Sequence, residues 1–242
     1  MITKNITKIF QRYMDARFPM IFGGQIIIFL TIKLFQHNYH VLNWQIDSQI
    51  PFVAEWIYIY LSFFVFMVVC CSYLFIKDRD SYYQVCRMAI IGAVITYIVF
   101  LCYPTEMVDE RNLCNVDALT RWLCMVTFAA DYPAINCFPS LHCVDTFIIV
   151  YSIYGSRNTK LWVRYVVLVV SVLIVLSILF TKQHYVVDIL GALIVVAIVV
   201  FIDKKKFWDL VFPVSQTRNL ASDIFILLKF HINGFIIRIR TF

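Results

Sequence analysis

The chain has 242 residues, of which 62% are hydrophobic and 15% are charged, whereas a soluble domain holds close to half apolar and about a quarter charged residues. This composition excludes an ordinary soluble domain. The net charge of +6 does not indicate nucleic-acid binding, because Lys and Arg flank apolar runs as membrane orientation requires. The eight cysteines form no CxxC pair, so no zinc or other metal site is predicted.

The apolar residues gather in runs of roughly 18 or more, about the length that crosses a hydrocarbon core as a helix. We therefore predict an all-α, polytopic membrane protein built as a six-transmembrane-helix bundle. The predicted spans are Phe18–Phe35, Pro51–Ile76, Met88–Tyr103, Phe138–Tyr154, Leu161–Phe180 and His184–Ile202. They divide the chain into an N-terminal segment (1–17), a membrane domain (18–203) and a basic, amphipathic tail (204–242). Within the tail, Asp223–Ile239 is predicted to be either an interfacial helix or a packing element.

Positive charges are distributed unequally between the two sides of these spans. With the N-terminus in the cytoplasm, 17 of the 21 Lys and Arg residues lie on the cytoplasmic side. By the positive-inside rule, this predicts an integral, multi-pass protein with both termini in the cytoplasm. The four remaining cations are Lys33, Arg111, Arg121 and Lys182.

One long, polar loop connects the third and fourth predicted spans on the outer side. Its middle, Ala118–Ala130, is apolar enough to form a short helix on the membrane surface. Cys114, Cys124 and Cys137 lie in this loop. An oxidising compartment would allow a disulfide among them, and packing as small buried residues is the alternative.

Three ionisable residues stand at the outer ends of the fourth and sixth predicted spans. His142 follows Pro139-Ser140-Leu141, while His184 and Asp188 open the sixth span. The spacing of i to i+4 places His184 and Asp188 on one helix face. Ionisable groups in membrane segments are costly and usually face a partner or an aqueous cavity, so we predict that the three form one site. Otherwise they are interfacial residues or a polar pair that orients two helices.

This combination suits phosphoryl transfer through a covalent histidine. Neutral His184 would attack phosphorus, and Asp188 would hold its ring and stabilise the positive charge that develops. His142 would protonate the leaving oxygen. The phosphate also needs cationic and backbone donors. The candidates for these phosphate contacts are Lys182, Ser140 and Arg111.

These residues resemble the motifs of the type-2 phosphatidic acid phosphatase superfamily. Its second motif, PSxH, matches Pro139-Ser140-Leu141-His142, and the HxxxD that ends its third motif matches His184 and Asp188. Its first motif, KxxxxxxRP, is absent, and Pro104-Thr105-Glu106…Arg111 is the nearest stretch.

Within that superfamily, the chain looks most like the compact branch that includes inositol phosphorylceramide and sphingomyelin synthases. In this branch a basic residue lies two positions before the histidine and a tyrosine directly after it, and here these are Lys182 and Tyr185. The stretches Asp47…Ile50-Pro51-Phe52…Tyr60 and Tyr103-Pro104-Thr105 are also similar to the branch. The resemblance covers roughly Asp47 to Asp203.

The resemblance implies a phosphohistidine mechanism that needs no metal or cofactor and a substrate that is a phospholipid or lipid phosphate of the bilayer. It carries over His184 as nucleophile, Asp188 as its partner and His142 as acid. We expect a phosphatase that hydrolyses a phosphomonoester or pyrophosphate lipid at the extracytoplasmic face. The alternatives are a phosphotransferase that passes the phosphoryl headgroup to a hydroxyl acceptor, and a non-enzymatic binder or transporter on the same scaffold. The sequence indicates neither the lipid headgroup nor the oligomeric state.

Overall fold

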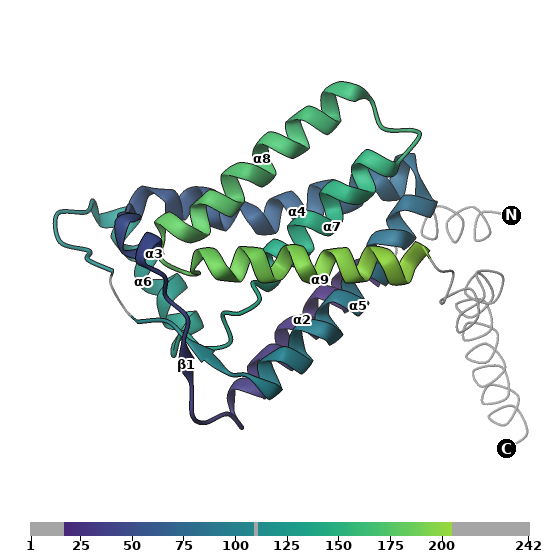
Figure 1. The fold of residues 1–242 in the computed structure, drawn as a ribbon. Helices are drawn as coiled ribbons and strands as arrows, with labels where there is room; N and C mark the ends of the chain where they lie inside the picture. The colour runs from purple at the N-terminus through teal and green to yellow at the C-terminus, as the bar shows by residue number, and fades with distance from the viewer. Residues whose placement is uncertain (1–16, 109–110, 205–242) are drawn as a thin grey trace, which may run out of the picture. The chain divides into compact units, whose positions relative to one another are not determined.

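The computed structural model describes residues 17–108 and 111–204 (Figure 1). The predictions for residues 1–16 and for the tail from 205 onward, including Asp223–Ile239, lie outside the described residues. The chain divides into two compact units, residues 1–200 and 201–242, and only 201–204 of the second unit are described.

The described chain is mostly helical, as predicted. The helices are α2 (Arg17–Lys33), α3 (Gln45–Gln49), η1 (Ala54–Trp56), α4 (Ile57–Lys77), α5 (Arg79–Cys102), α6 (Ala118–Asp131), α7 (Leu141–Gly155), α8 (Leu161–Phe180) and α9 (Val186–Lys204). Two short strands, β1 (His40–Val41) and β2 (Thr105–Glu106), pair in parallel.

Among the described residues, four helical segments are long and apolar enough to cross a membrane, which indicates a multi-pass membrane protein. They are Ala54–Lys77, Arg79–Cys102, Leu161–Phe180 and Val186–Lys204, at the second, third, fifth and sixth predicted spans. The first and fourth predicted spans are also helical, but α2 has 17 residues and α7 only 15. At about 1.5 Å per residue, α7 is shorter than a hydrocarbon core of roughly 30 Å. Six spans therefore stay a prediction.

Helix α5 begins at Arg79, well before the predicted span start at Met88. The reason is a cap: the Asp78 carboxylate accepts a hydrogen bond from the backbone N–H of Ser81 at 3.2 Å. The same carboxylate accepts the hydroxyl hydrogen of Ser156 at 2.7 Å. The turn between α4 and α5 is thereby joined to the turn between α7 and α8.

The α6 segment is helical, as predicted for the middle of the outer loop. Asp117 caps it by accepting hydrogen bonds from the N–H groups of Leu119 and Thr120. All eight cysteines are free, and Cys124 and Cys137 are buried whereas Cys114 is exposed. In this structure Cys124 and Cys137 therefore pack as small buried residues.

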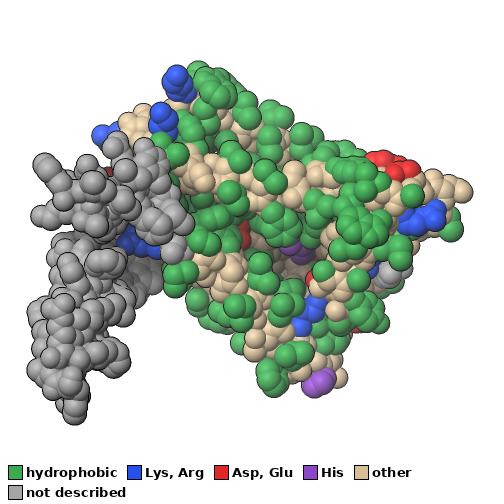
Figure 2. All heavy atoms as spheres, turned by 180° about the vertical axis from the view of Figure 1, so that it is seen from behind, with side chains coloured by type: hydrophobic (Ala, Val, Ile, Leu, Met, Phe, Trp, Pro, Cys, Tyr) green, Lys and Arg blue, Asp and Glu red, His purple; other side chains and the backbone are tan. Residues whose placement is uncertain are grey.

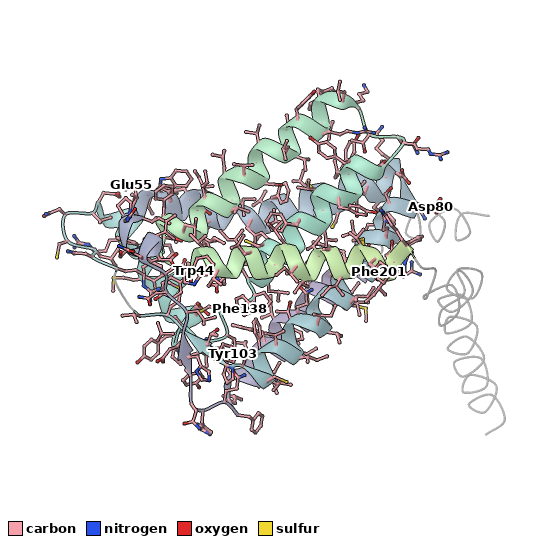
Figure 3. All side chains as sticks on the ribbon, in the orientation of Figure 1. Trp44, Glu55, Asp80, Tyr103, Phe138 and Phe201 are labelled. Carbon is pink, nitrogen blue, oxygen red and sulfur yellow. The ribbon has the colours of Figure 1, made fainter. Side chains whose placement is uncertain are left out.

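The turns that contain Lys and Arg residues, between α4 and α5 and between α7 and α8, lie at one end of the helix bundle. Helix α7 packs against α4, α5 and α8, while α2 lies along α5. The amide of Asn158 donates to the carbonyl of Lys77 at 3.2 Å, so the turns that follow α4 and α7 meet. In Figure 3, Asp80 marks this end, and Trp44, Tyr103 and Phe138 lie at the opposite one.

At that opposite end, α9 comes close to the loop before α7. A Cβ atom placed on Gly191 would lie 2.5 Å from Cε2 of Phe138 and 3.0 Å from Cβ of Pro139. Real atoms do not approach so closely, so only glycine lets Phe138 and Pro139 lie on the first turns of α9. The contact sets how α7 starts relative to α9.

We expect Gly191→Ala to destabilise the protein by about 1–3 kcal/mol, because the added methyl group must displace the ring of Phe138 and the rigid Pro139. Thermal unfolding of the purified variant measures the effect. Gly155→Ala is the matched control, since a Cβ at Gly155 meets nothing within 4 Å. Equal melting temperatures for the two variants would contradict the close approach.

Candidate active site

The candidate site lies where α7 and α9 begin. Ser140 caps α7, because its hydroxyl oxygen accepts a hydrogen bond from the N–H of Cys143 at 3.4 Å. The N–H of Ser140 itself donates to the carbonyl of Asp188 at 3.2 Å. The first turn of α7, which carries His142, is therefore tied to the first turn of α9, which carries Asp188.

His184 and Asp188 form a buried pair. Nδ1 of His184 lies 3.1 Å from Oδ2 of Asp188, and the two side chains are 10% and 1% exposed. The same Oδ2 accepts the N–H of Tyr185 at 2.9 Å, which fixes the carboxylate. A carboxylate at Nδ1 favours the tautomer with a proton there and leaves Nε2 as an acceptor or nucleophile.

His142 stands beside this pair. Its ring centroid lies 6.0 Å from that of His184, with the planes inclined at 61°. From α4, the hydroxyl of Tyr60 lies 3.4 Å from Nε2 of His142, and the ring of Phe63 is 4.7 Å away. Helix α4 therefore orients His142. The His184 ring is paired with a carboxylate, whereas the His142 ring packs against the aromatic rings of Tyr60 and Phe63.

The loop that leads to His142 is hydrogen-bonded to β2. The hydroxyl oxygen of Thr105 accepts hydrogen bonds from the N–H groups of Cys137 and Phe138, each at 3.0 Å. The carbonyl of Thr105 accepts the N–H of Asn136 at 2.7 Å. Thr105, in the stretch nearest to the family's absent first motif, thus supports the backbone before Ser140.

Lys182 lies directly before the pair, with its side chain held by α3. Its ammonium group donates to the carbonyl of Asp47 at 2.7 Å, and the residue is only 6% exposed. The Asp47 carboxylate accepts the N–H of Trp44 at 2.7 Å and that of Val186 at 2.8 Å. Asp47 therefore anchors the start of α9 as well as Lys182.

Arg111 lies over α6, with its guanidinium carbon 4.2 Å from the centre of the Phe128 ring. Its charge reaches Asp131, the last residue of α6. Burial raises the pKa of the Asp131 carboxyl, and the positive charges of Lys33 and Arg111 oppose that rise. The acidic end of α6 thus lies near two cations.

Two parts of this surrounding were not predicted. Lys33, at the end of α2, donates to the Asp131 carbonyl at 2.7 Å and lies 3.4 Å from its Oδ1. The sequence did carry a signal, because Lys33 is one of the few cations outside the cytoplasmic segments. Tyr60 was noted only as part of a similar stretch, and nothing in the sequence gave its contact with His142.

In the space-filling view, histidine atoms lie at the bottom of a hollow between hydrophobic side chains, with acidic and basic atoms nearby (Figure 2). Within the described ranges, no group of three or more His, Cys, Asp and Glu side chains is arranged to hold a metal ion. A metal-independent reaction remains a prediction for a chelator to test.

Comparison with known proteins gives one match. A family model described as the PAP2 superfamily matches residues 33–202, from the last residue of α2 almost to the end of α9. The matched range includes both histidines, Asp188 and the whole outer loop. No curated protein and no solved structure gives a significant match.

We expect Asp47→Ala to lower the stability by about 1–3 kcal/mol, because the N–H groups of Trp44 and Val186 lose their acceptors. Hydrogen exchange of these two amides should accelerate, which mass spectrometry of peptides from both segments detects. Asp47→Asn keeps one acceptor and should show a smaller effect. Unchanged exchange at Val186 in the alanine variant would contradict the anchoring role.

Proposed function

Because the chain belongs to the PAP2 superfamily, which includes phosphatases and phosphotransferases, we propose that it is an integral-membrane lipid phosphate phosphatase. It hydrolyses a phosphomonoester or pyrophosphate lipid through a phosphohistidine. The observation that carries this proposal is the His184–Asp188 pair at 3.1 Å with the second imidazole, His142, beside it.

In the first step, the Nε2 lone pair of His184 attacks phosphorus. The P–N bond forms as the P–O bond to the lipid breaks, and protonated His142 gives its proton to the leaving oxygen. Asp188 accepts the hydrogen bond from Nδ1–H and stabilises the positive charge on the ring. The products of this step are the lipid alcohol, or lipid monophosphate, and the phosphohistidine.

In the second step, water replaces the lipid. Neutral His142 takes a proton from the water whose oxygen attacks phosphorus, and the P–N bond breaks. Inorganic phosphate leaves, and His184 regains its neutral form. His142 returns to the protonated form that the next cycle requires.

The phosphate is held by cations and backbone donors around the histidines. Lys182 supplies an ammonium group next to His184, where it is held by the carbonyl of Asp47. The N-terminus of α7 offers backbone N–H groups beyond the cap of Ser140, and Arg111, in the loop before α6, lies over the Phe128 ring. The lipid tail lies between helices, where the surroundings are apolar.

The site faces the extracytoplasmic side in this proposal, with both termini in the cytoplasm. The opposite end of the bundle carries the turns with Lys77, Arg79, Arg157 and Lys160, whereas His142 and His184 lie at the end away from them. The positive-inside rule assigns the cation-rich end to the cytoplasm.

We expect His184→Ala to lower turnover by more than about 10³-fold, because the covalent intermediate cannot form. His142→Ala should cost about 10²–10⁴-fold, with less effect on substrates that have good leaving groups. Reactions quenched in alkaline detergent, with substrate radiolabelled at phosphorus, should trap label on the wild-type chain and none on the His184 variant, because a phosphohistidine is stable to alkali but not to acid. His37→Ala, at an exposed histidine, is the matched control. Substantial activity in His184→Ala would contradict the assignment of His184 as the nucleophile.

A panel of lipid phosphates and phosphodiesters, offered with and without alcohol acceptors, separates hydrolysis from transfer. We expect free phosphate to appear without any acceptor and at the same rate when a chelator is present. Turnover that needs an acceptor would instead assign the chain as a phosphotransferase. Strong inhibition by the chelator would contradict the metal-independent mechanism.

A further inference from the structure

Lys33 is placed unusually for a lysine at the end of an apolar helix. Such a side chain ordinarily extends toward water, yet the side chain of Lys33 is only 8% exposed. Its ammonium group donates to the backbone carbonyl of Asp131 and lies 3.4 Å from Oδ1 of the same residue. A charge so enclosed is costly unless it is paired, so this arrangement calls for a reason.

The backbone around Lys33 is fixed and directs the side chain toward α6. Ile32 is buried against Ala93, Tyr97 and Phe100 of α5, and Phe29 packs on the same cluster. The ammonium nitrogen also lies 5.2 Å from the centre of the Phe29 ring. The end of α2 is thus held on α5, and the Lys33 ammonium group lies between the Phe29 ring and Asp131.

The partner of Lys33 belongs to the surroundings of the catalytic pair. Asp131 is the last residue of α6, and Ala134, three residues further on, packs against the cluster of Cys137 and Tyr185. The N–H of Tyr185 shares Oδ2 of Asp188 with Nδ1 of His184. The contact between Lys33 and Asp131 is therefore made at the end of a segment that packs beside the catalytic pair, where a phosphate would bind.

A bound phosphomonoester would add roughly two negative charges to the site beside His184. The contacts of Lys33 with Asp131 engage at most two of its three N–H donors. The Asp131 carboxylate is an anion that an arriving phosphate can replace, and the backbone carbonyl would continue to hold the nitrogen. If phosphate replaces the Asp131 carboxylate at the Lys33 ammonium group, the buried ammonium group is paired with an anion both before and after phosphate binds.

We propose that Lys33 is a further phosphate-binding residue of this site and that the Asp131 carboxylate occupies its ammonium group until phosphate displaces it. This inference rests on the proposed function for the position of the phosphate. It adds a cation from α2 to Lys182 and Arg111. It also makes Asp131 a positioning residue that competes with the ligand.

The test is equilibrium binding of inorganic phosphate to the purified full chain, measured without turnover. Lys33→Met should weaken binding at least about tenfold, the loss expected for one charge-assisted hydrogen bond. Lys33→Arg keeps the charge and should recover most of the affinity. Lys77→Met is the matched control, because Lys77 also ends an apolar helix but is exposed at the other end of the bundle.

Asp131→Asn should change the phosphate affinity in the opposite direction to Lys33→Met. It therefore distinguishes a role in phosphate binding from a purely structural role. It removes the competing charge, so phosphate should bind about threefold or more tightly, a modest gain because the Asp131 side chain is still 29% exposed. A purely structural pair predicts that both variants weaken binding and melt at lower temperature. If Lys33→Met does not fold, Asp131→Asn decides alone, and unchanged or weaker binding overturns the inference.

The outcome is independent of the nucleophile. If His184→Ala retained activity, the proposed mechanism would be wrong. The phosphate affinities of the Lys33 and Asp131 variants would still test the role of Lys33. Conversely, a dissociation constant for phosphate within twofold of wild type in Lys33→Met overturns the role of Lys33, even when His184→Ala is inactive.

Discussion

Asp188 is the residue on which the rest of the site depends. Its carboxylate orients His184 and accepts the N–H of Tyr185, and its carbonyl accepts the N–H of Ser140 at the start of α7. One buried residue thereby fixes the ring of one histidine and the helix that carries the other. Because hydrogen bonds to a buried carboxylate are strong, this junction restricts both imidazoles at once.

The connecting segments at this end of the bundle act mainly by supporting this junction. Asp47 binds the backbone of Val186 and holds Lys182, while Thr105 holds the backbone before Phe138. None of these contacts involves a reacting group in the proposed mechanism. They add to the hydrogen bond between Ser140 and Asp188, and together these contacts restrict how far the two helix starts can separate.

The sequence predicts what depends on local hydropathy and on topology. Leu161–Phe180 is long and apolar, and α8 has the predicted bounds. Two helices that return from the same side bring His142 and His184 to one end of the bundle, so their proximity also follows. The early start of α5 was missed because a single cap at Asp78 extends the helix into polar residues.

Contacts between distant residues could not be predicted in the same way. Lys33 and Asp131 are 98 positions apart, and Lys182 and Asp47 are 135 apart. Each pair depends on how α2, α3 and α6 pack over the bundle end, and hydropathy does not report that packing. The length of α7 was also overestimated, because the chain bends at Phe138 and Pro139 and the helix begins only after its cap at Ser140.

In the proposed function, the shortness of α7 bears on how a lipid could reach the histidines. A helix of 15 residues rises about 22 Å, several ångströms less than a hydrocarbon layer that α4 and α5 can cross, so in the proposed orientation His142 would lie below the outer boundary of that layer. Lipids around such a helix adjust by local thinning of the bilayer. A phosphorylated lipid would then approach sideways within its own leaflet, with its acyl chains remaining in the membrane. Only water and the released phosphate would have to travel along the membrane normal.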